Sequence, residues 1–212
     1  MSRLTPKPLK MAVLISGSGR TLKNFIDLKG EDKLPIDLRL VISSSAEAGG
    51  LTHAKNADIP TRVILRSEFA SHEDYGKAIF SECRAAHVEY VVMAGFLKLV
   101  PIPDDFAGQV LNIHPSLIPS FCGQGMYGDR VHREVLEYGA KVTGCTVHFV
   151  DNQYDSGPVI WQQPVPVFDD DTASSLAARV FEAETEAYPH VLRLLAAGKI
   201  KLDGRRVRIA VG

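Results

Sequence analysis

Hydrophobic residues in the first half of the chain gather in short runs, most of which end at glycine or serine. A strand that is buried on both faces of a parallel sheet has this near-continuous apolar pattern, whereas a half-exposed strand alternates apolar and polar positions. The runs therefore predict buried strands at residues 11–15, 37–42, 61–65, 90–94 and 110–113.

Between these runs, apolar residues recur three and four positions apart, which is the spacing of one helix face. This spacing predicts helices at residues 21–28, 51–57 and 73–87. Strands that alternate with helices are typical of an α/β protein, in which a mostly parallel sheet is covered by helices on both faces. Ligands bind such sheets at the carboxyl ends of the strands.

The pattern changes after Pro119, where a glycine-rich segment separates the predicted sheet from a more irregular second part. Two apolar runs flank a polar loop and predict an antiparallel hairpin, and an aspartate-rich turn caps a long helix that Gly198 ends. The predicted elements are a helix at 131–138, strands at 143–150 and 159–163, a helix at 172–197 and an edge strand at 207–210.

No internal repeat or linker divides the 212 residues. We therefore expect residues 1–212 to form a single domain, a Rossmann-like mostly parallel sheet flanked by helices with an antiparallel hairpin toward its C-terminus.

Composition and charge exclude several classes of protein. A net charge of −1 does not support broad attraction to nucleic acid or to membranes. Cys83, Cys122 and Cys145 are odd in number and irregularly spaced, which fits neither a disulfide framework nor a zinc site. The polar start lacks the apolar core of a signal peptide, and no segment approaches the roughly 20 apolar residues of a membrane span. We expect a cytoplasmic protein with no metal and no nucleic-acid or membrane partner.

The stretch from Val110 to Pro119 contains the most distinctive candidate chemistry. Asn112 and His114 are two positions apart, so on a strand they share one face. An amide that can stabilise an oxyanion next to an imidazole that can move protons is an arrangement suited to acyl transfer. Each residue alone has a plainer interpretation, because a lone histidine is usually structural and an asparagine often caps a turn.

The glycine-rich turn after the first predicted strand is a candidate anion site. Backbone N–H groups at a helix start can hold a phosphate, and Arg20 and Thr21 can add side-chain contacts. Leu22 replaces the third glycine of a dinucleotide fingerprint, and the lysine of a Walker-type loop is missing. A tight turn without a ligand is the alternative at this stage. The candidate residues are Gly17, Ser18, Gly19, Arg20 and Thr21.

Asp155 lies in the predicted hairpin loop. It is either a solvated turn aspartate or a carboxylate that orients an imidazole. Sequence spacing alone does not bring it to His114. His148 lies on a strand pattern and stays unassigned, and the other histidines are interpreted as surface or structural residues: His53, His72, His87, His132 and His190.

Two segments resemble the signatures of the folate-dependent formyltransferases. The first is Leu111-Asn112-Ile113-His114-Pro115-Ser116-Leu117-Ile118-Pro119, and the second combines Thr146-Val147-His148-Phe149-Val150 with Asp155-Ser156-Gly157-Pro158-Val159-Ile160. The resemblance extends from the first strand to Tyr188-Pro189 and therefore covers nearly the whole chain. It implies the formyltransferase fold.

Within that family, the chain most resembles the branch that formylates glycinamide ribonucleotide with 10-formyltetrahydrofolate as co-substrate. The resemblance implies that Asn112 stabilises the oxyanion, that His114 and Asp155 act in proton transfer, and that the Gly17–Thr21 turn holds the substrate phosphate. It also implies that Glu184 contacts the substrate amine. The implied folate-binding residues are Phe96, Leu97, Lys98, Leu99, Val100, Val150 and Asp151.

The chain departs from the family pattern at Arg20 and in residues 120–128, which are longer than the usual short Pro-Gly linker. Alternatives within the family are a formyltetrahydrofolate deformylase, which usually carries an extra N-terminal domain, and a methionyl-tRNA formyltransferase, which would need a further domain and a basic surface. A formyltransferase with another phosphorylated amine acceptor, a nucleotide-binding oxidoreductase and a non-catalytic binding protein are further alternatives. We expect a monomer or a homodimer.

Overall fold

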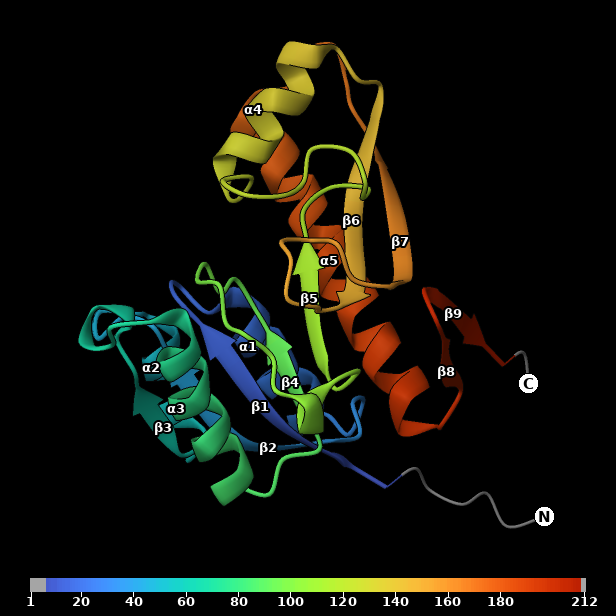
Figure 1. The fold of residues 1–212 in the computed structure, drawn as a ribbon. Helices are drawn as coiled ribbons and strands as arrows, with labels where there is room; N and C mark the ends of the chain where they lie inside the picture. Colours follow the sequence, from blue (N-terminus) through green and yellow to red (C-terminus); the bar gives the residue numbers. More distant parts are fainter. Residues whose placement is uncertain (1–6, 211–212) are drawn as a thin grey trace, which may run out of the picture.

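The computed structural model describes residues 7–210. Its centre is a seven-stranded sheet in the order β3-β2-β1-β4-β5-β6-β7 (Figure 1). The first five strands of this order are parallel, whereas β6 runs antiparallel to both of its neighbours, β5 and β7. The strands are β1 (Leu9–Ile15), β2 (Ile36–Ser43), β3 (Thr61–Val63), β4 (Tyr90–Met93), β5 (Val110–His114), β6 (Val142–Phe149) and β7 (Val159–Pro166).

Helices cover both faces of this sheet, as the continuous apolar runs predicted. Alternate residues of β1 belong to different cores: Met11 and Val13 pack into one cluster with residues of the long C-terminal helix, whereas Ala12 and Leu14 pack into another with residues of α3. The helices are α1 (Arg20–Gly30), α2 (Gly50–Asn56), α3 (His72–Ala85), α4 (Asp129–Tyr138) and α5 (Ala173–Ala196), with short 3-10 turns at Arg66–Glu68 and Asp104–Phe106. The predicted fold class is confirmed.

The C-terminal part differs from the prediction in two details. Strand β7 continues through Pro164 to Pro166, beyond the predicted end at Gln163. Because β7 is the outermost strand of the sheet, prolines that lack an N–H donor are tolerated there. The strand expected at 207–210 is β9 (Arg206–Ile209), which does not extend the large sheet but pairs with an unpredicted strand β8 (Ile200–Asp203) in a separate hairpin.

The long helix α5 packs against β6 and β7 and also contacts β1 in the parallel part of the sheet. Thr172 caps its start through a reciprocal pair of hydrogen bonds with Ser175, as the aspartate-rich turn suggested. The fully buried Tyr188 donates a hydrogen bond of 3.1 Å from its hydroxyl to the Met93 carbonyl at the end of β4. No helix within residues 7–210 is long and apolar enough to cross a membrane.

Candidate functional site

Strand β5 places Asn112 and His114 on one face, at the carboxyl end of the parallel part of the sheet. The His114 side chain is buried, whereas Asn112 is half-buried. Both residues line a cavity of about 370 Å³, which also contacts the turns after β1 and β4. These turns meet on one rim because β1, β4 and β5 run parallel and end on the same side of the sheet.

Asp155 reaches this rim through a chain reversal that the sequence did not reveal. Strand β6 runs antiparallel to β5, so that Phe149 ends beside Leu111, away from His114. The loop between β6 and β7 must then fold back toward the carboxyl end of β5. Gly157 permits this return, since a Cβ at this position would collide with the Phe149 carbonyl oxygen. Asp155 itself has a positive φ of 49°.

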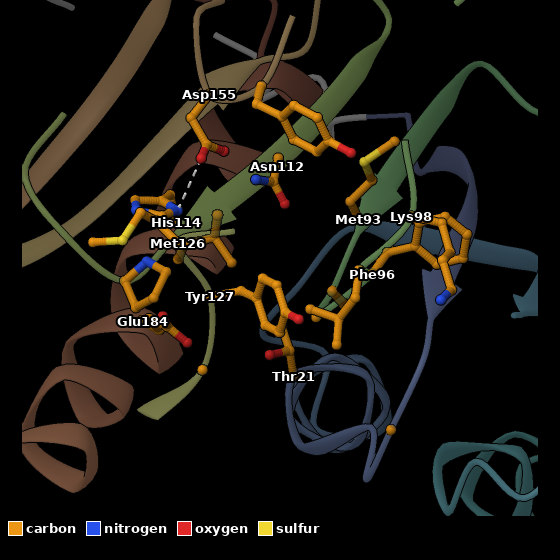
Figure 2. A pocket seen from close by; sticks show the side chains of 18 of the residues that line it. Thr21, Met93, Phe96, Lys98, Asn112, His114, Met126, Tyr127, Asp155 and Glu184 are labelled. Atoms are coloured by element: carbon orange, nitrogen blue, oxygen red, sulfur yellow. Dashed lines mark ion pairs between the residues drawn. The ribbon is translucent and has the colours of Figure 1, made fainter. Parts of the chain in front are cut away.

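The Asp155 carboxylate lies between two buried histidines. Its Oδ2 is 3.5 Å from His114 Nδ1, and its Oδ1 is 3.8 Å from His148 Nε2. Figure 2 shows the Asp155 carboxylate directed at His114. The backbone N–H of Gly123 donates a hydrogen bond of 2.9 Å to Oδ2. The structure therefore brings Asn112, His114 and Asp155 together, and adds the glycine-rich segment and His148 to the same cluster.

Hydrogen bonding restricts which nitrogen of His114 can exchange a proton. Nε2 lies 2.9 Å from the Phe121 carbonyl oxygen, which can only accept, so Nε2 carries a hydrogen. Nδ1 faces Asp155 and remains the nitrogen that can gain or lose a proton.

His148 holds Asn112 from the neighbouring strand, directly opposite it in register. Its Nδ1 donates to the Phe149 carbonyl at 2.8 Å, which leaves Nε2 to accept from Asn112 Nδ2 at 3.3 Å. Burial lowers the pKa of His148 and favours the neutral form that this arrangement requires. The second N–H of the Asn112 amide remains available for a ligand.

The Gly17–Thr21 turn borders the same cavity at the start of α1. Gly19 has a φ of 72°, and a Cβ there would collide with the backbone of Gly50, so the turn requires glycine. The guanidinium of Arg20 lies 4.0 Å from the centroid of the Phe181 ring on α5. The turn therefore combines backbone donors at a helix start with a positioned cation, which suits an anionic ligand.

Glu184 projects from α5 into the cavity, across from Thr21 (Figure 2). Burial raises the pKa of Glu184 to about 8, and the nearby Arg20 partly opposes this rise. No other residue within 7–210 makes a hydrogen bond or ion pair with its carboxyl group. Such a carboxyl group suits an amine or ammonium ligand, because a cation would favour its ionised form.

The segment after β4 forms another wall of the cavity. Gly95 turns the chain with a φ of 71°, and the N–H of Leu97 donates to Ser16 Oγ at 3.0 Å. Ser16 Oγ is in turn 2.7 Å from Ser44 Oγ, so the rim turns of three strands are linked. All of the residues that the sequence predicted for a folate pocket line this cavity: Phe96, Leu97, Lys98, Leu99, Val100, Val150 and Asp151.

The sequence matches the model of a known protein family over most of its length. Residues 9–192 match the family model of the formyl transferases. The chain belongs to the formyl transferase family.

Individual relatives agree with this family. This formyl transferase is 38% identical to the phosphoribosylglycinamide formyltransferase of Escherichia coli (strain K12), over 94% of this chain and 96% of that protein. It is 39% identical to the trifunctional purine biosynthetic protein adenosine-3 of Gallus gallus, over 94% of this chain but only 20% of that protein. The chain thus spans about a fifth of the trifunctional relatives.

A solved structure has the same fold. The crystal structure of glycinamide ribonucleotide transformylase 1 from Symbiobacterium toebii is 37% identical to this formyl transferase, with a TM-score of 0.91. The similarity covers 100% of this chain and 98% of that one.

Two features of this formyl transferase were missed from the sequence. His132 was grouped with surface or structural histidines, but it is buried on α4, lines the cavity and has no hydrogen-bond partner for its Nδ1 within residues 7–210. Burial lowers its pKa. His148 carried only a strand pattern, and its contact with Asn112 depends on strand register, which no local signal specifies. No group of three potential metal ligands is present within 7–210.

Proposed function

We propose that this formyl transferase moves the formyl group of 10-formyltetrahydrofolate to the amine of glycinamide ribonucleotide. The observation that carries the proposal is the convergence of the Asn112–His114–Asp155 cluster, the Gly17–Thr21 turn and Glu184 on a single cavity. In this proposal the cluster acts on the formyl carbonyl of the folate. The turn binds the phosphate of glycinamide ribonucleotide, and Glu184 contacts its amine. The names of the relatives support the same reaction.

In the proposed reaction, the neutral amine attacks the formyl carbon and a tetrahedral intermediate forms with negative charge on oxygen. The free N–H of Asn112 stabilises this oxyanion, while the other N–H remains bound to His148 Nε2. An amide held in this way needs no reorientation as charge develops. Loss of a single such donor typically costs about two to three orders of magnitude in rate.

His114 and Asp155 supply the proton transfer and the compensating charge. The attacking nitrogen must lose a proton and N10 of the folate must gain one as the carbon–nitrogen bond to N10 breaks. The Nδ1 of His114, which faces Asp155, can carry this proton, whereas the contact with Phe121 keeps the hydrogen on Nε2. An imidazolium at this position also stabilises the oxyanion.

Substrate placement follows from the walls of the cavity. The N–H groups of the Gly17–Thr21 turn and the Arg20 side chain bind the phosphate of glycinamide ribonucleotide, and Glu184 accepts a hydrogen bond from its amine. Phe96, Leu97 and Val100 supply apolar contacts for the folate, and the other predicted folate residues complete that wall: Lys98, Leu99, Val150 and Asp151. We propose that residues 1–212 act as one formyltransferase domain.

The proposal is tested by incubating the purified protein with 10-formyltetrahydrofolate, with and without glycinamide ribonucleotide. We expect formylated ribonucleotide to appear in equal amount to the folate consumed, and no folate consumption without the amine. Folate turnover without acceptor would instead indicate a hydrolytic deformylase. A failure with glycinamide ribonucleotide but success with another phosphorylated amine would retain formyl transfer and replace the acceptor.

A further inference from the structure

A second cavity of about 740 Å³ lies behind the loop that carries Asp155. One wall is formed by Tyr154 to Val159, and another by residues 205–208 of the β8–β9 hairpin. Tyr154 and Asp155 line both this groove and the catalytic cavity. We call it the hairpin groove. Apart from Asp155, its lining residues have no assigned role in the proposed formyl transfer.

Three arginines line the hairpin groove: Arg205, Arg206 and Arg208. Arg206 and Arg208 are two positions apart on β9 and therefore share one face of the strand. Among residues 7–210, Asp155 is the only carboxylate in the wall, and its Oδ2 accepts a hydrogen bond from the Gly123 N–H and faces His114. Positive charge is therefore in excess in this groove.

These arginines are only partly neutralised by the protein. Arg208 is paired with Asp203 at 2.9 Å, which is outside the groove wall. Arg205 donates from Nη2 to the Ser156 carbonyl at 2.6 Å, which orients the guanidinium without neutralising it. Arg206 makes no side-chain hydrogen bond or ion pair with any residue in 7–210. Donors of both Arg205 and Arg206 remain free for a ligand.

We propose that the hairpin groove is a second binding site, which takes a di- or triphosphate group. Guanidinium groups match phosphate oxygens through paired hydrogen bonds, and several charges within one concave wall favour an anion that carries more than one charge. The half-exposed ring of Tyr154 and the apolar side chains of Ile118 and Val159 line the same groove. The phosphate group therefore comes either from free polyphosphate or from a nucleotide whose base contacts these apolar walls.

A ligand bound in the hairpin groove also restrains the loop that carries Asp155. Arg205 holds Ser156, the residue next to Asp155. A phosphate that binds Nη1 or Nε of Arg205 restricts that side chain further and leaves its bond to Ser156 intact. A ligand that binds the folded chain more tightly than the unfolded chain also raises the thermal unfolding temperature.

The site is tested by titrating the full chain with tripolyphosphate and with ATP in a calorimeter. The Arg206→Glu variant removes a guanidinium that has no internal bond and is expected to weaken tripolyphosphate binding about tenfold to one-hundredfold. Lys55→Glu is the matched control, because Lys55 is an exposed cation on α2 that lines neither cavity. It should retain affinity within about twofold, a difference typical of a remote surface charge.

A third variant distinguishes binding in the hairpin groove from binding at the Gly17–Thr21 turn. Arg20→Ala is expected to leave the groove affinity unchanged, because Arg20 lines only the catalytic cavity. Binding that Arg20→Ala abolishes and Arg206→Glu leaves intact would overturn the proposal. Equal losses in Lys55→Glu and Arg206→Glu, or no binding of either probe, would also overturn it. Tighter binding of ATP than of tripolyphosphate, reduced by Tyr154→Leu, identifies a nucleotide as the source, and equal binding identifies free polyphosphate. This outcome does not depend on formyl transfer.

Discussion

His148 Nε2 lies 3.3 Å from Asn112 Nδ2, and the Nδ1 of the same ring donates to the Phe149 carbonyl at 2.8 Å. The histidine is therefore held in one tautomer and uses one of the two amide hydrogens of Asn112. Because His148 is itself buried and fixed, its contact with the amide also orients the remaining hydrogen of Asn112. This fixed orientation suits the half-buried Asn112 amide to the oxyanion-donor role that we propose for it.

Replacement of Asn112 by alanine should lower kcat by about two to three orders of magnitude, since the oxyanion donor is lost. The measurement is steady-state formyl transfer at saturating concentrations of both substrates. Asn56→Ala, at the exposed end of α2, is the matched control and should retain wild-type turnover. A rate for Asn112→Ala within threefold of wild type would exclude this role.

Replacement of Asp155 by asparagine should reduce kcat strongly while the fold persists. The new amide oxygen can still accept the Gly123 N–H, but the negative charge that faces His114 Nδ1 is lost. Circular dichroism and thermal unfolding should remain close to wild type, whereas kcat falls by about tenfold or more, as expected for impaired proton transfer. If turnover stays normal and only the unfolding temperature drops, Asp155 has a structural role alone.

Glu184 should make stability depend on pH. Its pKa is about 8 in the folded chain against 4.5 for an ordinary glutamate, so the folded state binds more protons than the unfolded state between these values. The free energy of unfolding that Glu184 contributes must therefore decrease as pH rises from about 4.5 to about 8.

Urea unfolding of wild type and Glu184→Gln at pH 5 and pH 8 measures this effect. The variant cannot ionise, so its stability relative to wild type should increase between the two pH values. A stability difference that is the same at both would show that Glu184 titrates normally.

Gly157→Ala should destabilise the protein by more than about 1 kcal/mol, because the added Cβ collides with the Phe149 carbonyl and prevents the return of the Asp155 loop. Gly30→Ala is the control, since a Cβ at that exposed helix position contacts nothing within 4 Å. Gly30→Ala should be neutral or stabilising. Urea unfolding distinguishes the two, and comparable stabilities would contradict the steric argument.

Local patterns along the chain were sufficient for most of the architecture. The apolar run at residues 11–15 was continuous because β1 packs into two cores, and the three- and four-residue spacing in α1 marked its buried face. Of the separate β8–β9 hairpin only β9 was predicted, as an edge strand at 207–210. β8 was missed, although Ile200 and Leu202 alternate with polar residues as in a half-exposed strand. The strands that are buried on both faces were therefore predicted more fully than this exposed hairpin.

Asn112 and His114 could be paired from the sequence alone, because two residues of one strand share a face whatever the remaining chain does. The positions of Asp155 and His148 depended on tertiary structure. His148 meets Asn112 only through the register of β5 with β6, and Asp155 meets His114 only because Gly157 lets the loop reverse. Contacts of this kind join residues that are distant along the chain, and local periodicity carries no information about the distances between them.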